Sequence, residues 1–258
     1  MERRLTTGSD TEGRCLQVVF SEEFDSGAGS GPDPEIWSAE LGGGGWGCDQ
    51  LQLYTGDRSN VAITEEGHLA ITAWRSPDGT VTSARLITKD RFAVQYGLIE
   101  ARIKVPGGIG TWPAFWMLGS DIDEVGWPEC GEIDVMEHVG SDPCTVHGTV
   151  HAPGYAGLGG GLGAAHRTGS DLSHYFHIYG IDWDASHITW LLDGRPYHRM
   201  TAAEAPGSVW PFRHSFCLVV NLAVGGAWRG NDTEEPLLPA TLLVDGQIRT
   251  LPNRKRAE

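Results

Sequence analysis

Glu132, Asp134 and Glu137 lie within six residues of one another in a segment that otherwise contains Ile, Val and Met. In a β-strand, where side chains alternate between faces, Glu132 and Asp134 share one face and Glu137 points to the other. A β-bulge at Val135 or Met136 would insert one residue and bring Glu137 beside the other two. We therefore expect a bulged strand that presents three carboxylates on one face.

Two carboxylates about 5–6 Å apart are what retaining glycosidases use, one as nucleophile and the other as general acid and then general base. The bulge would place Glu132 and Glu137 at about this separation. Asp134 between them would share a proton or a hydrogen bond and hold their pKa values apart. An edge strand with a solvated acidic face explains the same pattern, so other residues must decide.

The elements around this segment also have the pattern of strands. The 36 Gly and 14 Pro residues are spread along the chain as turn signals, and helical periodicity is nearly absent. Strands are predicted at residues 17–20, 68–74, 84–88, 96–105, 114–118, 132–138, 145–151, 177–184, 188–192, 196–200 and 216–223. Short helices are predicted only at 171–175 and 201–204. Many short strands with so little helix indicate a β-sandwich or jelly roll.

The glycine clusters at 42–45 and 154–163 are expected to form loops. Each is either a plain connector or the rim of a cleft.

The chain is long enough for one large domain. Its 258 residues are 40% hydrophobic, so we expect a single domain over 1–258 with an ordered core from about 16 to 250. No apolar run approaches the ~18 residues of a membrane span, and the first residues lack the apolar segment of an export signal. A cytosolic protein and an exported protein trimmed of its leader are both compatible with this start.

Charge and cysteine spacing exclude several functions. Nineteen Lys and Arg against 34 Asp and Glu give a net charge of −15, which disfavours nucleic acid, anionic membranes and sulfated or carboxylated substrates. The five cysteines show no CxxC spacing, which argues against a zinc site or a redox motif. Cys130 and Cys144 would lie too far apart along a hairpin to form a disulfide.

Aromatic residues suggest a sugar-binding surface. Trp112 and Trp116 are four apart in a strand and share a face, and Trp127 leads into the carboxylate strand. Their rings could stack on the apolar faces of a neutral sugar. Three other tryptophans are expected in the core: Trp183, Trp190 and Trp210.

The segment at 131–140, GEIDVMEHVG, resembles the Glu-x-Asp-x-x-Glu signature of glycoside hydrolase family 16, in the longer version of the laminarinase branch. Further segments resemble the family in family order: Tyr96–Val105, Trp112–Gly119, Thr145–His151 and Asn221–Gly226. The resemblance extends from about Phe20 to Asp245. It implies an all-β jelly-roll sandwich of two antiparallel sheets with a concave glucan-binding cleft, which agrees with the predicted strands.

The resemblance also implies roles for individual residues. Glu132 would be the nucleophile, Glu137 the acid/base and Asp134 a supporting carboxylate. Arg85 and Asn60 would reach sugar hydroxyls, although an exposed turn asparagine and a surface arginine explain them equally well.

Two histidines lie on one face of the strand at 145–151. A hairpin turning near Ser141 would bring His151 across from Glu132, so we expect His151 in the cleft in preference to His147. A structural histidine is the alternative.

By resemblance, main-chain oxygens of Glu23 and Gly67 and the carboxylate of Asp245 correspond to a structural calcium site, with ordinary solvated loops as the alternative. No cofactor is implied for the chemistry. Gln50 and Cys48 depart from the family's usual residues at the cleft rim.

These observations predict a retaining endo-β-1,3-glucanase that acts on laminarin-like glucans. Its partner would be a neutral β-glucan, and the protein would be a monomer that is secreted, as the family resemblance implies. A β-glucan transglycosylase, a mixed-linkage β-1,3-1,4-glucanase and a non-catalytic β-glucan-binding module are the alternatives.

Overall fold

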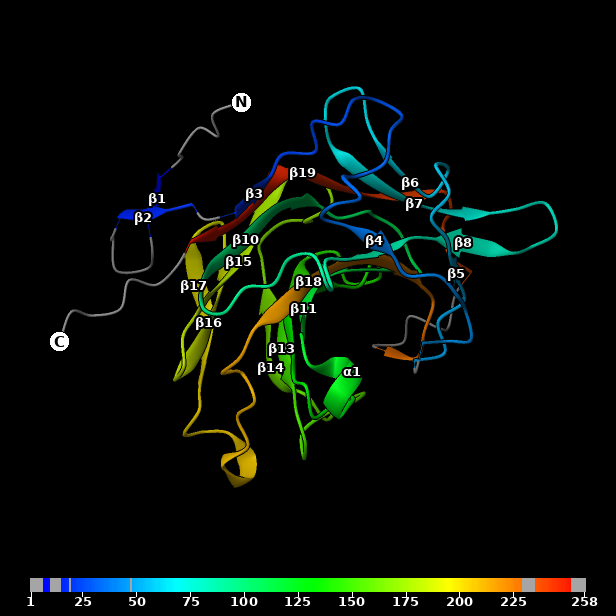
Figure 1. The fold of residues 1–258 in the computed structure, drawn as a ribbon. Coiled ribbons are helices and arrows are strands. Elements are labelled where there is room, and N and C mark those ends of the chain that lie inside the picture. The colour runs from blue at the N-terminus through cyan, green and yellow to red at the C-terminus, as the bar shows by residue number, and fades with distance from the viewer. Residues whose placement is uncertain (1–6, 10–14, 19, 47, 229–234, 252–258) are drawn as a thin grey trace.

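The computed structural model describes residues 7–9, 15–18, 20–46, 48–228 and 235–251. In this part of the chain, two large β-sheets pack face to face (Figure 1). The helical elements whose bounds are described are short: α1 (Ile122–Val125) and the 3₁₀ turn Pro206–Ser208. The predicted all-β sandwich is confirmed.

The sheet that carries the carboxylates has seven strands, and all its pairings are antiparallel. In spatial order they are β14 (Leu162–Arg167), β13 (Thr145–His151), β12 (Glu132–His138), β11 (Thr111–Gly119), β18 (Phe216–Val224), β9 (Arg85–Ile87) and β4 (Ser38–Ala39). The carboxylate strand β12 lies between β11 and β13. The edge-strand explanation is therefore wrong.

The other sheet has ten strands. Its main path is β17 (Arg195–Thr201), β16 (His187–Leu192), β15 (His177–Trp183), β10 (Gly97–Lys104), β19 (Ala240–Leu251), β7 (Leu69–Arg75), β8 (Val81–Ser83) and β5 (Leu53–Tyr54). Beside this path, β3 (Phe20–Glu22) pairs with β19 and β6 (Val61–Ile63) pairs with β7. One pairing, β5 with β8, is parallel, and β1 (Thr7–Ser9) and β2 (Cys15–Gln17) form a separate hairpin.

The expected bulge is present in β12. Asp134 pairs with Thr149 and Glu137 pairs with His147, so Val135 and Met136 together face a single residue of β13. The pairing with β11 shifts at the same place. The inserted residue turns Glu137 to the face of the other two carboxylates, as predicted.

Trp190, in the core between the sheets, packs against this bulge. The Trp190 indole N–H donates a hydrogen bond to the main-chain oxygen of Asp134 at 2.8 Å. A Cβ atom on Gly148, the residue opposite the bulge, would come within 2.3 Å of the Trp190 ring. Trp183 and Trp210 are also buried, which confirms the core assignment of all three tryptophans.

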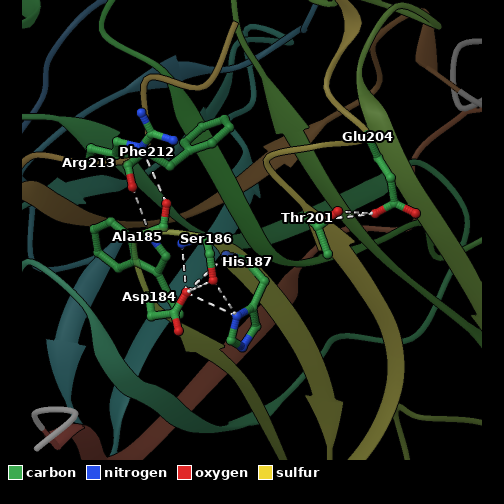
Figure 2. A network of polar contacts seen from close by, with 9 residues as sticks. Asp184, Ala185, Ser186, His187, Thr201, Glu204, Phe212 and Arg213 are labelled. Atoms are coloured by element: carbon green, nitrogen blue, oxygen red, sulfur yellow. Dashed lines mark hydrogen bonds and ion pairs between the residues drawn. The ribbon is translucent and has the colours of Figure 1, made fainter. Parts of the chain in front are cut away.

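The two predicted short helices are wrong. Residues 171–175 form turns and a bend, because the Asp171 carboxylate accepts a hydrogen bond from the Ser173 main-chain N–H at 2.7 Å. Residues 201–204 form the end of β17 and a turn. There the Glu204 carboxylate accepts hydrogen bonds from the main-chain N–H and the hydroxyl of Thr201, both at 2.8 Å (Figure 2). In both places a local side-chain hydrogen bond replaces the helical one.

A similar network closes the turn between β15 and β16. The Asp184 carboxylate accepts hydrogen bonds from the main-chain N–H groups of Ser186 and His187 at 2.7 and 3.0 Å (Figure 2). The Arg213 side chain donates a hydrogen bond to the Ala185 carbonyl at 3.3 Å. This bond connects the loop that follows the 3₁₀ turn Pro206–Ser208 to the turn between β15 and β16. These contacts fix one end of the sheet that carries Trp190.

No helix among the described residues has the length and apolar character needed to cross a membrane. The thiols of Cys48, Cys130, Cys144 and Cys217 are free.

His138, at the end of β12, makes the stability of the fold depend on pH. Its side chain is fully buried, Nδ1 donates to the Thr145 carbonyl at 2.9 Å, and burial lowers its pKa from the ordinary 6.5. The folded state therefore binds fewer protons than the unfolded state below about pH 6.5. As the pH is lowered through that window, the free energy of unfolding should fall by up to about 1.4 kcal/mol per pH unit because of this group.

Urea unfolding at pH 7.5 and 5.5, compared between the wild type and His138→Asn, measures this contribution. The variant keeps a donor for Thr145 but cannot take up a proton, so its stability should fall less between the two pH values. An equal fall in both proteins would contradict the prediction.

Candidate active site

The register of the seven-stranded sheet aligns the site residues in rows that cross the strands. One row runs from β9 to β14 through Arg85, Asn221, Ala114, Glu137, His147 and Ala165. A second row brings together Leu118, Glu132 and His151. All of these residues line a single cleft of about 540 Å³.

Most of the predicted site residues meet in this cleft. Its lining includes Glu132, Asp134, Glu137, Trp112, Trp116, Trp127, His151 and Arg85. It also includes Cys48 and Gln50, as expected for the rim. Four glycines of the 154–163 segment line the cleft as well, together with Leu158: Gly157, Gly159, Gly161 and Gly163. The rim interpretation of that glycine cluster is thus supported, although its last residues begin β14.

Each of the two glutamates accepts a hydrogen bond from an indole. Trp112 Nε1 donates to Glu137 Oε1 at 3.1 Å, and Trp127 Nε1 donates to Glu132 Oε2 at 2.9 Å. Trp112 is buried, whereas Trp127 is 45% exposed at the mouth of the cleft. The indoles hold the two carboxylates in place from opposite sides of Asp134.

His151 faces Glu132 across the β12–β13 pair, as the hairpin predicted. Its Nε2 lies 3.3 Å from Asp134 Oδ2 and 3.8 Å from Glu132 Oε1. The backbone of Gly161 covers the imidazole, because a Cβ atom there would lie 2.4 Å from His151 Cε1. We expected only His151, and not His147, in the cleft. His147 also lines the cleft, with its ring centre 4.9 Å from that of Trp228.

Burial raises the pKa values of all three carboxyl groups. The pKa of Glu132 rises to about 8, mainly by desolvation and then by repulsion from Asp134, while His151, Trp127 and Arg85 oppose the rise. Desolvation also raises the pKa of Asp134 to about 8, against a hydrogen bond with Glu132.

Glu137 differs from Glu132 in its electrostatic surroundings. Desolvation raises its pKa well above the ordinary value, and both Asp134 and Glu132 add repulsion. His151 and the Trp112 hydrogen bond oppose this rise. Desolvation and repulsion both favour the protonated form of Glu137, which is the form that a general acid needs.

Arg85 lies between two indoles in the cleft. Its guanidinium carbon is 4.7 Å from the ring centre of Trp46 and 4.7 Å from that of Trp116. Its Nε pairs with the carboxylate of Glu40. Contacts with two indoles and one carboxylate restrict the orientation of the guanidinium before any ligand arrives.

Several cleft residues were missed by the sequence analysis. Trp46, Tyr54, Asn221 and Trp228 all line the cleft. Asn221 did carry a signal, since it is the single amide in the otherwise apolar β18 segment FCLVVNLAV. Trp46 and Trp228 lie in loops, where no periodicity assigns a face.

Asn60 does not belong to the cleft. It is buried, its Oδ1 accepts from the Thr55 hydroxyl at 2.7 Å, and its Nδ2 donates to the Thr72 carbonyl at 2.8 Å and to the Thr82 hydroxyl at 3.1 Å. Its polar groups are thus used within the fold. The expectation that Asn60 reaches a sugar is corrected accordingly.

The residues expected at a calcium site do not fit one. The Asp245 carboxylate, the one side-chain ligand of the expected site, pairs with Arg102 and lies 3.3 Å from His68 Nδ1. A calcium ion at Asp245 would have to displace the guanidinium. Among the described residues, three potential metal ligands converge only in the cleft, where atoms of Glu132, Asp134 and His151 lie within 4.8 Å of one another.

Comparison with known proteins agrees with this geometry. The model of the family "Glycosyl hydrolases family 16" matches residues 49–237. The beta-glucanase of Rhodothermus marinus is 43% identical over 253 residues, which cover 92% of this chain and 87% of the relative. The laminarinase catalytic domain of Thermotoga maritima MSB8 is 42% identical, with a TM-score of 0.84 over 93% of this chain and 99% of that one. The endo-beta-1,3-glucanase of Pyrococcus furiosus is 39% identical, with a TM-score of 0.85 over 95% and 98% of the two chains.

Replacing Gly161 tests whether the loop positions His151. In Gly161→Ala, the new methyl group would push against His151 and Thr149, whose Cγ2 would lie 2.6 Å away. We expect kcat/KM on a β-1,3-glucan to fall by about tenfold or more, because small displacements of site groups are costly. Gly169→Ala is the matched control, since a Cβ there meets nothing within 4 Å. Equal activity of the two variants would contradict a positioning role for the loop.

Proposed function

The chain belongs to glycosyl hydrolases family 16, and we propose that it is a retaining endo-β-1,3-glucanase that hydrolyses laminarin-like β-glucans. The observation that carries the proposal is the bulge of β12, which sets Glu132 and Glu137 on one face of a cleft-lining strand. Each carboxylate accepts one indole hydrogen bond, and the two differ in charge surroundings.

The mechanism follows from this arrangement as a double displacement. Ionised Glu132 attacks the anomeric carbon, and protonated Glu137 gives its proton to the departing glycosidic oxygen, so that a glycosyl-enzyme ester forms as the glycosidic bond breaks. Glu137, now ionised, takes a proton from water, and the water oxygen attacks the same carbon and releases Glu132. The enzyme returns to its starting protonation state, and the sugar keeps its anomeric configuration.

The other polar groups support these two steps. Arg85 and His151 favour the ionised form of Glu132. Asp134 repels negative charge on both glutamates, and this repulsion favours the protonated form of Glu137 before the proton is transferred. At Glu132 the repulsion is opposed by His151, Trp127 and Arg85.

The cleft surface is suited to a neutral sugar chain. Trp46, Trp112, Trp116, Trp127 and Trp228 contribute to its lining. Such rings bind apolar sugar faces without needing a charge. The partner in this proposal is a neutral β-glucan, bound by a secreted, monomeric catalytic domain that needs no cofactor for the chemistry.

Product analysis tests the proposal against its alternatives. The purified protein is incubated with laminarin, mixed-linkage β-glucan, agarose and κ-carrageenan, and both reducing ends and product sizes are followed. We expect a ladder of oligosaccharides from laminarin. Products longer than the substrate would indicate a transglycosylase, preferential cleavage of mixed-linkage glucan would indicate a lichenase-type enzyme, and binding without products would indicate a binding module.

Removal of the nucleophile separates catalysis from binding. In Glu132→Gln, the amide still accepts a hydrogen bond from Trp127 but cannot attack, so kcat should fall by about 10⁴-fold while laminarin binding persists. Glu129→Gln, an exposed position near the same strand, is the matched control and should retain activity. Full activity in Glu132→Gln would contradict the assignment.

A further inference from the structure

Arg85 is the one Lys or Arg side chain among the described residues that line the cleft. Its side chain is only 14% exposed, and its guanidinium lies against the indoles of both Trp46 and Trp116. Its Nε donates to Glu40, which leaves the two Nη groups as its remaining donors. The cleft thus presents the edge of one strong cation to a ligand.

Glu40 is held beside Arg85 by the backbone. It follows β4, which pairs with β9, and its main-chain N–H donates to the Arg85 carbonyl at 2.9 Å. Its own side chain is 30% exposed and is not part of the cleft lining. Glu40 can therefore act on a bound ligand only through Arg85.

Tyr54 connects the two indoles that hold the guanidinium. Its ring lies 5.3 Å from that of Trp46, and its hydroxyl accepts a hydrogen bond from Asn221 Nδ2 at 3.1 Å. Asn221 Oδ1 in turn accepts from Trp116 Nε1 at 2.7 Å. The position of Arg85 is therefore set by a connected group of buried contacts and does not need a ligand to form.

A guanidinium with free Nη groups is a strong receptor for carboxylate and sulfate groups, which it binds in pairs of charge-assisted hydrogen bonds. The carboxylate of Glu40 places a compensating negative charge directly on the same guanidinium. The Nη groups can still donate hydrogen bonds to uncharged hydroxyls. The Arg85–Glu40 pair, however, attracts an anion less strongly than Arg85 alone would.

We propose that Glu40 is a specificity-determining residue that makes the cleft select neutral glucans over carboxylated or sulfated ones by cancelling the charge of Arg85. This inference rests on the proposed function, because it concerns the substrate of the same cleft.

The test compares two substrates that share a β-1,3 backbone, laminarin and carboxymethylated curdlan. In Glu40→Gln the amide still accepts the Arg85 hydrogen bond but carries no charge. The ratio of kcat/KM for carboxymethylated curdlan to that for laminarin should rise by about two- to fivefold, the range expected for one partly exposed charge. The rise should disappear at about 1 M salt, where charges are screened within about 3 Å.

Glu35→Gln is the matched control, since it makes the same change in net charge at an exposed site. In the double variant Glu40→Gln/Arg85→Gln, the gain should be lost, because the uncompensated cation is gone. Glu40→Ala provides the same comparison if the Gln variant folds poorly. An unchanged ratio in the folded Glu40 variants, or an equal rise in Glu35→Gln, would overturn the inference.

The wild type separates this result from the proposed function. If it hydrolyses laminarin while the Glu40 variants keep the wild-type ratio, only the role of Glu40 is wrong. If it hydrolyses neither substrate, the glucanase proposal itself fails.

Discussion

The contact between Trp190 and the bulge of β12 is the constraint on which the site depends. The bulge leaves the Asp134 carbonyl available for the Trp190 indole N–H, and Gly148 opposite it leaves room for the ring. A buried carbonyl without a partner would cost about 1–3 kcal/mol, so the indole stabilises the irregular backbone that the chemistry needs. Without the inserted residue, Glu137 would point into the sandwich core instead of the cleft.

The same bulge creates an electrostatic problem that the cleft resolves locally. Three carboxyl groups lie together at a buried site, and desolvation raises the pKa of each. At Glu132, repulsion from Asp134 adds to this rise in pKa, and His151 and Arg85 counter it. At Glu137, repulsion from both Asp134 and Glu132 adds to the rise, and His151 counters it. Burial and repulsion would be a cost elsewhere in the fold, but in the proposed mechanism they help to keep the proton donor protonated beside the nucleophile.

The sequence was sufficient for features that depend on local alternation. The strand β12 has the predicted bounds, the bulge lies at the predicted residues, and His151 faces Glu132 because a hairpin fixes its register. The division of tryptophans into cleft and core groups followed from the same rules.

Features that depend on distant strands or on loops could not be predicted in this way. Asn60 is captured by Thr72 and Thr82, and Asp245 pairs with Arg102 of a neighbouring strand. Glu40 meets Arg85 only once β4 has paired with β9. Alternation assigns a face to each of these side chains but does not identify the partner from another strand that shares it.

The anomeric configuration of the first product tests the central claim most directly, because it reports how Glu132 and Glu137 cooperate. Proton NMR of laminarin hydrolysis, recorded within the first minutes before mutarotation, resolves the α and β anomeric signals of new reducing ends. Attack by Glu132 followed by water predicts that the β anomer appears first and the α anomer only later. An initial α product would show inversion by a single displacement and would contradict the roles assigned to the two carboxylates on the bulged strand.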